Sequence, residues 1–315
     1  MVYFTVAIPT YNGAKKLPLL LDKLQSQSQV AQLNWEVLVV DNNSQDNTCE
    51  VIREYQEKWS NSLSLRYVFE KRQGAAFARQ HAIETAQSEL VGFLDDDVLP
   101  NNNWVAAAYQ FAQQNPEAGA YGGQIHGNFE VEPPPNFNKI ASFLAIRELG
   151  SQPRLYEPEK LILPPSASWV VRKSVWLACV PECPSLGGRA NGSMMQGDDY
   201  EPLLHMHGEG WEIWYNPAME VNHQIPRQRL EATYLTSLSR GCGQSICHLR
   251  MINTPKGEKW KVLWDTLLGT ELRRAVRFFV KNRHQLKTDL VTSCEMAFHW
   301  GRWESGWYFL KQNWL

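Results

Sequence analysis

Residues 2–94 alternate four short apolar runs with three segments of helical periodicity, and this pattern narrows the possible folds more than any other feature. The expected strands are 2–8, 35–41, 63–70 and 90–94, and the expected helices are 15–27, 48–59 and 75–86. Consecutive strands that are joined by a helix lie parallel, with the helix covering one face of the sheet. The chain is therefore predicted to fold as an α/β protein with a mostly parallel sheet flanked by helices.

Polar residues follow each of the four predicted strands at the point where it ends. They are Pro9–Asn12, Asp41–Ser44, Glu70–Gly74 and Asp95–Asp97. Ligands of open parallel sheets bind beyond the carboxyl ends of the strands, so we expect these four segments to form one site. A dinucleotide site is the obvious alternative, but the first turn lacks the G-x-G-x-x-G pattern.

The fourth strand ends in three adjacent carboxylates, which repel one another unless a positive charge lies between them. Side chains alternate along an extended segment, so Asp95 and Asp97 are expected to point one way and Asp96 the other. Two carboxylates on one side suit a hard divalent cation. A solvated acidic turn is the alternative explanation.

The charge of the 315-residue chain is unevenly distributed, although its net value is only -2. Residues 1–225 carry 16 Lys and Arg against 26 Asp and Glu, whereas residues 226–315 carry 15 against 7. The absence of a secretory signal pattern predicts a cytoplasmic location, with the six cysteines as reduced thiols. A structural zinc held by Cys179, Cys183, Cys242 and Cys247 is an alternative, although their spacing matches no common zinc pattern. No nucleic-acid partner is expected.

The motifs at the ends of the first, second and fourth strands and in the third helix resemble, in order and spacing, those of family-2 glycosyltransferases, which have the GT-A fold. The matching segments are Val6–Asn12, Val37–Ser44, Gly74–Gln80 and Phe93–Asp97. The resemblance covers roughly residues 3–225. The sequence departs from the family pattern at Gln80, where Asn is usual. It implies a GT-A catalytic domain over 1–225, with a nucleotide-binding half at 1–100 and an acceptor-binding half at 101–225.

The resemblance also implies which residues bind the substrates. The residues that would contact the donor nucleotide are Pro9, Tyr11, Asp41, Arg79 and Asp95. The metal ligands for Mn²⁺ or Mg²⁺ would be Asp97, Asp95 and His223. A lone histidine that closes a strand is commonly structural, so both interpretations of His223 stay open. Arg227 and Arg229 are candidate contacts for the phosphates.

Asp198 and Asp199 stand at the start of a predicted helix, where acids stabilise the positive end of the helix dipole. The alternative is catalytic, because a positioned carboxylate can remove the proton of an acceptor hydroxyl. Family members carry an acidic pair here, usually Glu-Asp, and the second acid acts as the base. Asp199 matches that position and is the predicted catalytic base, while Asp198 replaces the usual Glu.

The remaining segments give less specific predictions. Residues 140–148 are expected to form a helix, 179–195 a flexible acceptor-side loop, and 211–223 two short strands around an Asn-Pro turn. Residues 226–315 form a predicted basic, mostly helical extension. Its helix near 259–283 carries an aromatic and leucine-rich stripe, which either packs on the catalytic domain or lies on an anionic membrane surface.

The resemblance thus predicts a metal-dependent, inverting glycosyltransferase that uses a nucleotide-diphosphate sugar as donor. The acceptor would be a saccharide or lipid-linked saccharide in cell-surface polysaccharide synthesis, with similarity to enzymes of hormogonium polysaccharide. The protein would lie in the cytoplasm or peripherally at the inner face of the plasma membrane. The alternatives are a sugar nucleotidyltransferase and a non-catalytic saccharide-binding protein with the same fold.

Overall fold

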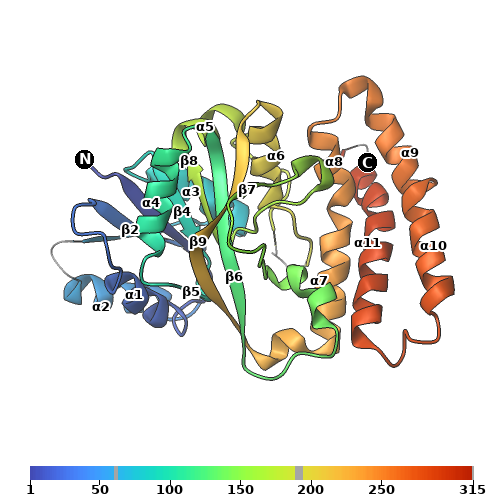
Figure 1. Ribbon diagram of the computed structural model, residues 1–315, viewed down its shortest axis with the longest axis horizontal. Helices are drawn as coiled ribbons and strands as arrows, with labels where there is room; N and C mark the ends of the chain where they lie inside the picture. Colours follow the sequence, from blue (N-terminus) through green and yellow to red (C-terminus); the bar gives the residue numbers. More distant parts are fainter. Residues whose placement is uncertain (60–62, 189–193, 314–315) are drawn as a thin grey trace.

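The computed structural model describes residues 1–59, 63–188 and 194–313, which form a nine-stranded mixed sheet with helices on both faces and a helical extension (Figure 1). The strands pair in the order β3-β2-β1-β4-β8-β6-β9-β5, and β7 pairs with β9 off this path. Their bounds are β1 Phe4–Thr10, β2 Trp35–Asp41, β3 Ser64–Phe69, β4 Leu90–Leu94, β5 Val98–Pro100, β6 Ala118–Phe129, β7 Arg154–Leu155, β8 Ser168–Arg172 and β9 Glu212–Ile225. The expected α/β class is confirmed.

The strands β3, β2, β1 and β4 run parallel, as the alternation of residues 2–94 predicts. They are connected by α1 (Leu17–Gln25), α2 (Thr48–Lys58) and α3 (Ala75–Thr85). Gly74 precedes α3 with a φ of +137°, and a Cβ atom there would lie 2.6 Å from the carbonyl oxygen of Gly187. Only glycine satisfies both the backbone angle and the close approach.

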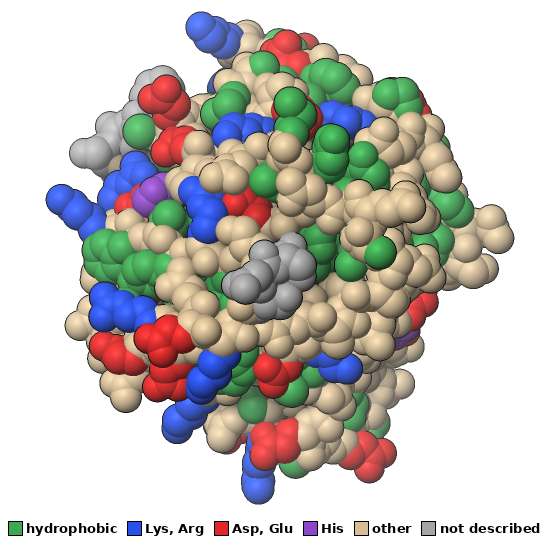
Figure 2. Space-filling view, turned by 90° about the vertical axis from the view of Figure 1, so that its left-hand side faces the viewer, with side chains coloured by type: hydrophobic (Ala, Val, Ile, Leu, Met, Phe, Trp, Pro, Cys, Tyr) green, Lys and Arg blue, Asp and Glu red, His purple; other side chains and the backbone are tan. Residues whose placement is uncertain are grey.

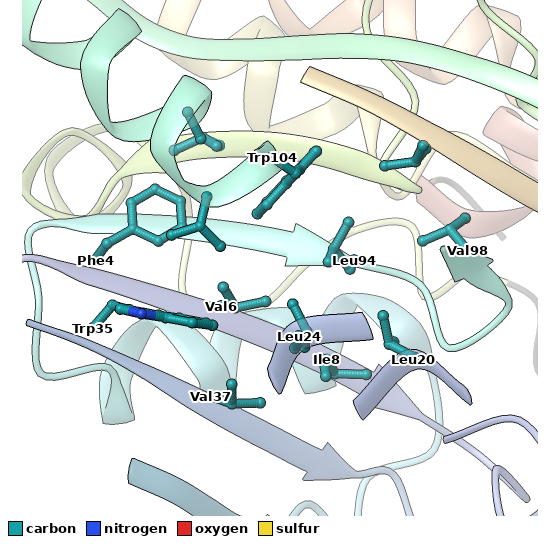
Figure 3. Packing of buried hydrophobic residues seen from close by; sticks show 14 of the residues in the cluster. Phe4, Val6, Ile8, Leu20, Leu24, Trp35, Val37, Leu94, Val98 and Trp104 are labelled. Atoms are coloured by element: carbon teal, nitrogen blue, oxygen red, sulfur yellow. The ribbon is translucent and has the colours of Figure 1, made fainter. Parts of the chain in front are cut away.

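Apolar side chains cover both faces of the parallel strands. On one face, Leu20 and Leu24 of α1 lie over Ile8 of β1, and Trp104 packs edge-on against Phe4 (Figure 3). The Trp104 indole also donates a hydrogen bond of 2.9 Å to the Ser168 hydroxyl, which ties α4 (Trp104–Gln114) to β8. Strands covered on both faces carry continuous apolar runs, which explains the sequence pattern.

The second half of the sheet mixes strand directions. Strand β8 lies antiparallel between β4 and β6, and β6 runs parallel to β9. The helices of this half are α5 (Lys173–Cys179) and α6 (Tyr200–Gly208). Its short 3-10 helices are η1 (Phe137–Lys139), η2 (Ala141–Leu144) and η3 (Pro158–Lys160), and η4 (Arg227–Leu230) follows β9.

Two predictions for this half are wrong. Residues 140–148 form only the single turn η2, which ends at Ala145 with a φ of +60°, and Arg147 then bridges to Ile125. Residues 212–223 form part of one continuous strand, because the pairing with β6 shifts register between Gly122 and Gln124 and leaves the Asn-Pro segment of β9 as an irregularity within it. At Gly123, a Cβ atom would lie 1.8 Å from the Met219 carbonyl oxygen, so this pairing also requires glycine.

The predicted helical extension is confirmed, and it shares apolar contacts with the sheet domain. It contains α7 (Ala232–Gln244), α8 (Ile246–Ile252), η5 (Lys256–Glu258), α9 (Lys259–Leu267), α10 (Thr270–Asn282) and α11 (Leu290–Asn313). Helices α7 and α8 lie nearest the sheet, α11 packs beside them, and α9 and α10 form the outer edge (Figure 1). One apolar cluster joins Ile140 and Leu144 to Leu235 of α7 and Val291 of α11.

The helix predicted near 259–283 is divided into α9 and α10. The Asp265 carboxylate accepts a 3.0 Å hydrogen bond from the Thr270 N–H, which stabilises the turn between the two helices. Only part of the apolar stripe packs inward, since Ala275 is buried whereas Trp260, Trp264 and Val280 are 63%, 62% and 60% exposed.

No helix within the described part of the chain combines the length and the apolar character that a membrane crossing requires. Figure 2 shows the face that lies at the left of Figure 1, where basic and acidic side chains are interspersed. The negative charge of residues 1–225 is therefore not gathered into a single patch on that face.

Candidate active site

A cavity of about 350 Å³ lies at the carboxyl ends of the parallel strands. The residues that line it on the side of the first half are Pro9, Thr10, Tyr11, Lys16, Asn42, Gln73, Arg79, Asp95, Asp96 and Asp97. Those from the second half and the extension include Ser166, Gln196, Asp198, Asp199, His223, Arg229 and Leu238. The four polar segments that follow the strands thus lie around one cavity.

The acidic residues form a turn rather than an extended segment. The Val98 N–H donates to the Asp95 carbonyl at 3.2 Å, which closes the turn. Asp96 accepts hydrogen bonds of 2.7 Å from the Thr10 hydroxyl and 2.8 Å from the Lys16 ammonium, which also lies 3.8 Å from Asp97. The predicted alternation is therefore wrong, since Asp96 and Asp97 approach the same cation.

Asp97 is paired with positive charge from the segment after β9. Its carboxylate accepts a 2.6 Å hydrogen bond from Arg229, and His223 Nε2 lies 3.5 Å away. His223 Nδ1 is 2.9 Å from the Leu144 carbonyl oxygen and must donate to it, so Nε2 can accept the 2.8 Å hydrogen bond from Arg229. His223 is thereby held in one orientation at the cavity wall.

The acidic turn shifts the pKa values of its partners. Burial lowers the pKa of Lys16, but the charges of Asp96 and Asp97 outweigh it and raise the pKa above the usual value. Arg229 shows the same balance, with burial opposed chiefly by Asp97. Burial raises the pKa of Asp96 despite its contact with Lys16. The acidic turn therefore favours the charged forms of Lys16 and Arg229.

The donor set at this turn fits a hard divalent cation, because it consists of carboxylate oxygens that already attract two protein cations. Among the described residues, no three His, Cys, Asp or Glu side chains are grouped as a ready metal site. Asp97, Asp95 and His223 therefore stay a predicted set of ligands. Rearrangement of the Arg229 contact would free Asp97 for the metal.

The predicted nucleotide contacts are divided between the cavity and the core. Pro9 and Tyr11 line the cavity, and Tyr11 is 47% exposed at its rim. Asp41 is buried and accepts hydrogen bonds of 2.9 Å from both the Tyr67 hydroxyl and the Ser44 N–H. Its neighbour Asn42 lines the cavity instead.

Arg79 and Asp198 form a buried ion pair that also lines the cavity. Their side chains meet at 2.6 Å, and Arg79 also donates a 2.7 Å hydrogen bond to the Ser166 hydroxyl. Arg79 is only 4% exposed and lies on α3, whereas Asp198 precedes α6. The two residues are 119 positions apart in the chain, so the pair joins the two halves of the domain.

Asp199 lies next to this ion pair and accepts a 3.2 Å hydrogen bond from the Ser166 N–H. Burial and then the Asp198 carboxylate raise the pKa of Asp199 to about 6, against the opposing effects of Arg79 and the Ser166 N–H. A carboxylate with a pKa near neutrality can both accept and release a proton under working conditions.

Sequence reasoning missed Lys16 and Ser166. Ser166 stands in a segment of small residues, and its two contacts depend on Arg79 of α3 and on Asp199, which precedes α6. Lys16 follows the first predicted turn and carried no distinguishing motif. Residues 189–193 of the predicted acceptor-side loop lie outside the described residues.

The sequence model of Glycosyl transferase family 2 matches residues 5–176, so the chain belongs to this family. It is 35% identical to glycosyltransferase AglE of Haloferax volcanii over 103 residues, which are 33% of each protein. It is 30% identical to a validoxylamine A glucosyltransferase of Streptomyces hygroscopicus over 155 residues, covering 47% of this chain and 36% of that protein. The chain therefore spans about a third of the length of these curated relatives.

Solved structures confirm the GT-A fold of glycosyltransferases. The mannosyltransferase PcManGT of Pyrobaculum calidifontis, in complex with GDP-Man and Mn²⁺, superposes with a TM-score of 0.62 at 19% identity. That comparison covers 99% of this chain and 87% of the other. Residues 1–349 of TarS from Staphylococcus aureus, in complex with UDP-GlcNAc, give a TM-score of 0.55 at 16% identity, covering 100% and 93%.

The raised pKa of Asp199 leads to a prediction about the pH dependence of transfer. A general base must be ionised, so kcat/KM is expected to rise about tenfold per pH unit below pH ~6 and to level off above it. The measurement is initial transfer rate against pH, beside Glu209→Gln, which removes an exposed carboxylate from the end of α6. An unchanged profile in Asp199→Asn would contradict the assignment, and Glu209→Gln should retain the profile of the parent.

Proposed function

We propose that this protein is a metal-dependent, inverting glycosyltransferase that moves a sugar from a nucleotide-diphosphate sugar to a hydroxyl of a saccharide or lipid-linked saccharide. The observation that carries the proposal is a single cavity that has Asp97 with its cations on one side and Asp199 on the other. The biosynthetic role that we favour is cell-surface polysaccharide synthesis, which membership of glycosyltransferase family 2 supports.

The nucleotide would bind along the first turn and the start of α3. In this proposal Tyr11 packs on the base, Pro9 shapes its pocket, and Asp41 accepts a base N–H after exchanging one of its present partners. Asp95 contacts the ribose, and the phosphates lie near Lys16 and Arg229, whose charges oppose theirs. Arg79 acts mainly by holding Asp198, since its guanidinium is already engaged there.

The acidic turn would hold Mn²⁺ or Mg²⁺ through Asp97, with Asp95 and His223 as further candidate ligands. A divalent ion in this position supplies positive charge to the leaving diphosphate. Lys16 and Arg229 add fixed charge on the same side of the cavity. The developing negative charge is thus met by groups that are oriented before the reaction, which is the usual source of electrostatic catalysis.

Asp199 would remove the proton of the acceptor hydroxyl as its oxygen attacks the anomeric carbon. The new carbon–oxygen bond forms on the face opposite the leaving group, while the bond from the sugar carbon to the diphosphate breaks. The bonding electrons leave with the nucleoside diphosphate, and the proton ends on Asp199. Ser166 and the ion pair of Arg79 with Asp198 keep Asp199 in place. One displacement with one base inverts the configuration.

We also propose that the catalytic domain ends near residue 225 and that residues 226–315 form an extension, which reaches the cavity through Arg229 and Leu238 and has a surface role at its outer helices. The boundary follows the end of β9, and helices dominate the chain from there on. The location that fits this arrangement is the cytoplasm, with peripheral contact at the inner face of the plasma membrane.

Two substitutions separate the metal end from the base end. Asp97→Asn is expected to abolish Mn²⁺-dependent binding of UDP or GDP, because an amide is a weaker ligand for a hard cation. Asp199→Asn should bind the same nucleotide as well as the parent but transfer sugar roughly 10²–10⁴-fold more slowly. Calorimetric titration and a transfer assay measure the two effects. If Asp97→Asn keeps metal-dependent binding, the acidic turn is not the metal site.

The outer helices suggest how the protein would contact a membrane. Exposed Trp260 and Trp264 belong to α9, and exposed Val280 lines a surface hollow on α10 together with Arg273 and Arg277. Aromatic insertion and attraction to anionic lipid both stabilise such a contact, with about 1 kcal/mol for each nearby basic residue. The surface formed by α9 and α10 is therefore our proposed site of peripheral binding.

This contact predicts co-sedimentation with anionic vesicles that weakens as the salt concentration rises. Reversing three exposed charges of α10 (Arg273→Glu, Arg277→Glu and Lys281→Glu) should abolish it. The matched control reverses three exposed charges of the sheet domain, at Arg53 and Lys58 of α2, which lies at the opposite end of the molecule from α9 and α10 in Figure 1, and at Lys71 after β3. Equal loss in both variants, or no binding by the parent at low salt, would contradict a role for this surface.

A further inference from the structure

A second cavity, of about 300 Å³, adjoins the first on the side of the helical extension. The two cavities share Phe143, Ala145, Pro165, Gln196 and Asp199 in their walls. Asp199 therefore stands at the junction, with the proposed metal and phosphate sites in one cavity and different surroundings in the other.

The wall of the second cavity is largely apolar. Its apolar residues apart from the shared ones are Leu161, Ile162, Ile246, Leu249 and Phe298. Phe143 and Phe298 are in contact, with ring centroids 5.1 Å apart. Among the described residues that line it, Arg147 and Asp199 carry charge. An apolar wall beside a catalytic carboxylate favours a ligand that brings an apolar group next to a hydroxyl.

The helical extension supplies an essential part of this wall. Ile246 and Leu249 belong to α8, and Phe298 belongs to α11, so the sheet domain alone does not enclose the cavity. Both helices stand on the side of the extension that faces the sheet, with α9 and α10 further out (Figure 1). The extension therefore contributes directly to the surroundings of the proposed base.

Arg147 provides a polar contact at the edge of the apolar wall. Its Nη2 atom donates to the Leu163 carbonyl at 3.3 Å and to the Tyr200 hydroxyl at 3.2 Å. Its buried Nε atom has no hydrogen-bond partner among the described residues. A buried donor without a partner is costly, so an oxygen of a bound ligand would stabilise it.

We infer that the second cavity binds the acceptor, and that it selects an acceptor whose sugar carries an apolar aglycone, such as an aryl or alkyl group. This inference rests on the proposed function, in which Asp199 removes the proton of the acceptor hydroxyl. The apolar group occupies the space between Phe143, Ile246 and Phe298, and an oxygen next to it accepts from Arg147. Acceptor specificity thus comes from the extension as well as from the sheet domain.

Matched acceptors test the inference. The probes are the p-nitrophenyl, octyl and methyl glycosides of a set of monosaccharides, compared within each monosaccharide. Hydrolysis of the donor by water is measured in parallel. The aryl and octyl acceptors should have kcat/KM values at least about tenfold above the methyl acceptors, which corresponds to the burial of roughly two methylene groups. Preference for only one of the two would identify whether the aglycone is aromatic or a hydrocarbon chain.

Substitutions at Ile246 test whether the preference for aryl and octyl acceptors arises in the second cavity. Ile246→Glu places a charge in the wall and Ile246→Phe fills the space, so both should remove the advantage of the apolar acceptors. Donor hydrolysis and nucleotide binding should stay at the level of the parent. Leu177→Glu introduces the same charge at an exposed site of α5 and is the matched control.

The outcomes distinguish the inference from the function on which it rests. Transfer with equal kcat/KM for all three acceptors, or an apolar preference that both Ile246 variants retain, overturns the inference and leaves the proposed function standing. If the parent neither hydrolyses nor transfers any donor, the proposed function fails and the inference fails with it. Ile246→Phe keeps the test decisive if Ile246→Glu does not fold.

Discussion

The buried ion pair between Arg79 and Asp198 is the contact on which the geometry of the site depends. Two charges removed from water are stable only when each is paired and their remaining hydrogen-bonding groups are well placed. Asp198 provides the opposite charge, and the Ser166 hydroxyl takes a second donor of Arg79. Asp199 follows in the chain and accepts from the Ser166 N–H. The same pair thus helps to position the proposed base, and its Asp198 carboxylate contributes to the raised pKa of Asp199, which Arg79 opposes.

The two sides of the main cavity have opposite electrostatic requirements. At the acidic turn, Asp96 and Asp97 attract Lys16 and Arg229, so the protein holds positive charge where a diphosphate would need it. Around Asp199, burial and a neighbouring carboxylate make ionisation harder. The pKa of this proton acceptor is therefore raised toward neutral pH. A leaving group that gains negative charge and a hydroxyl that loses a proton require these two environments.

The sequence predicted the parallel half of the fold well, because local periodicity determines both its elements and their order. The second half depends on pairing between distant segments, and there 140–148 and 211–223 were mispredicted. Prediction of the site residues has the same limit, because contacts between distant segments cannot be seen in the sequence. Asp199 and Asp97 could be identified from motifs, whereas the 119-residue separation of Arg79 from Asp198 hides their contact. The shorter Asp198, where the family usually has Glu, is directly supported by that arginine.

The stereochemistry of the product tests the central claim most directly. Proton NMR of the transfer reaction, started with a nucleotide sugar of known anomeric configuration, reports the coupling constant of the new glycosidic bond as it forms. A single displacement assisted by Asp199 predicts that every product bond has the configuration opposite to that of the donor. A first product that retains the configuration of the donor would contradict the account, because it would require a mechanism other than one attack with one carboxylate base.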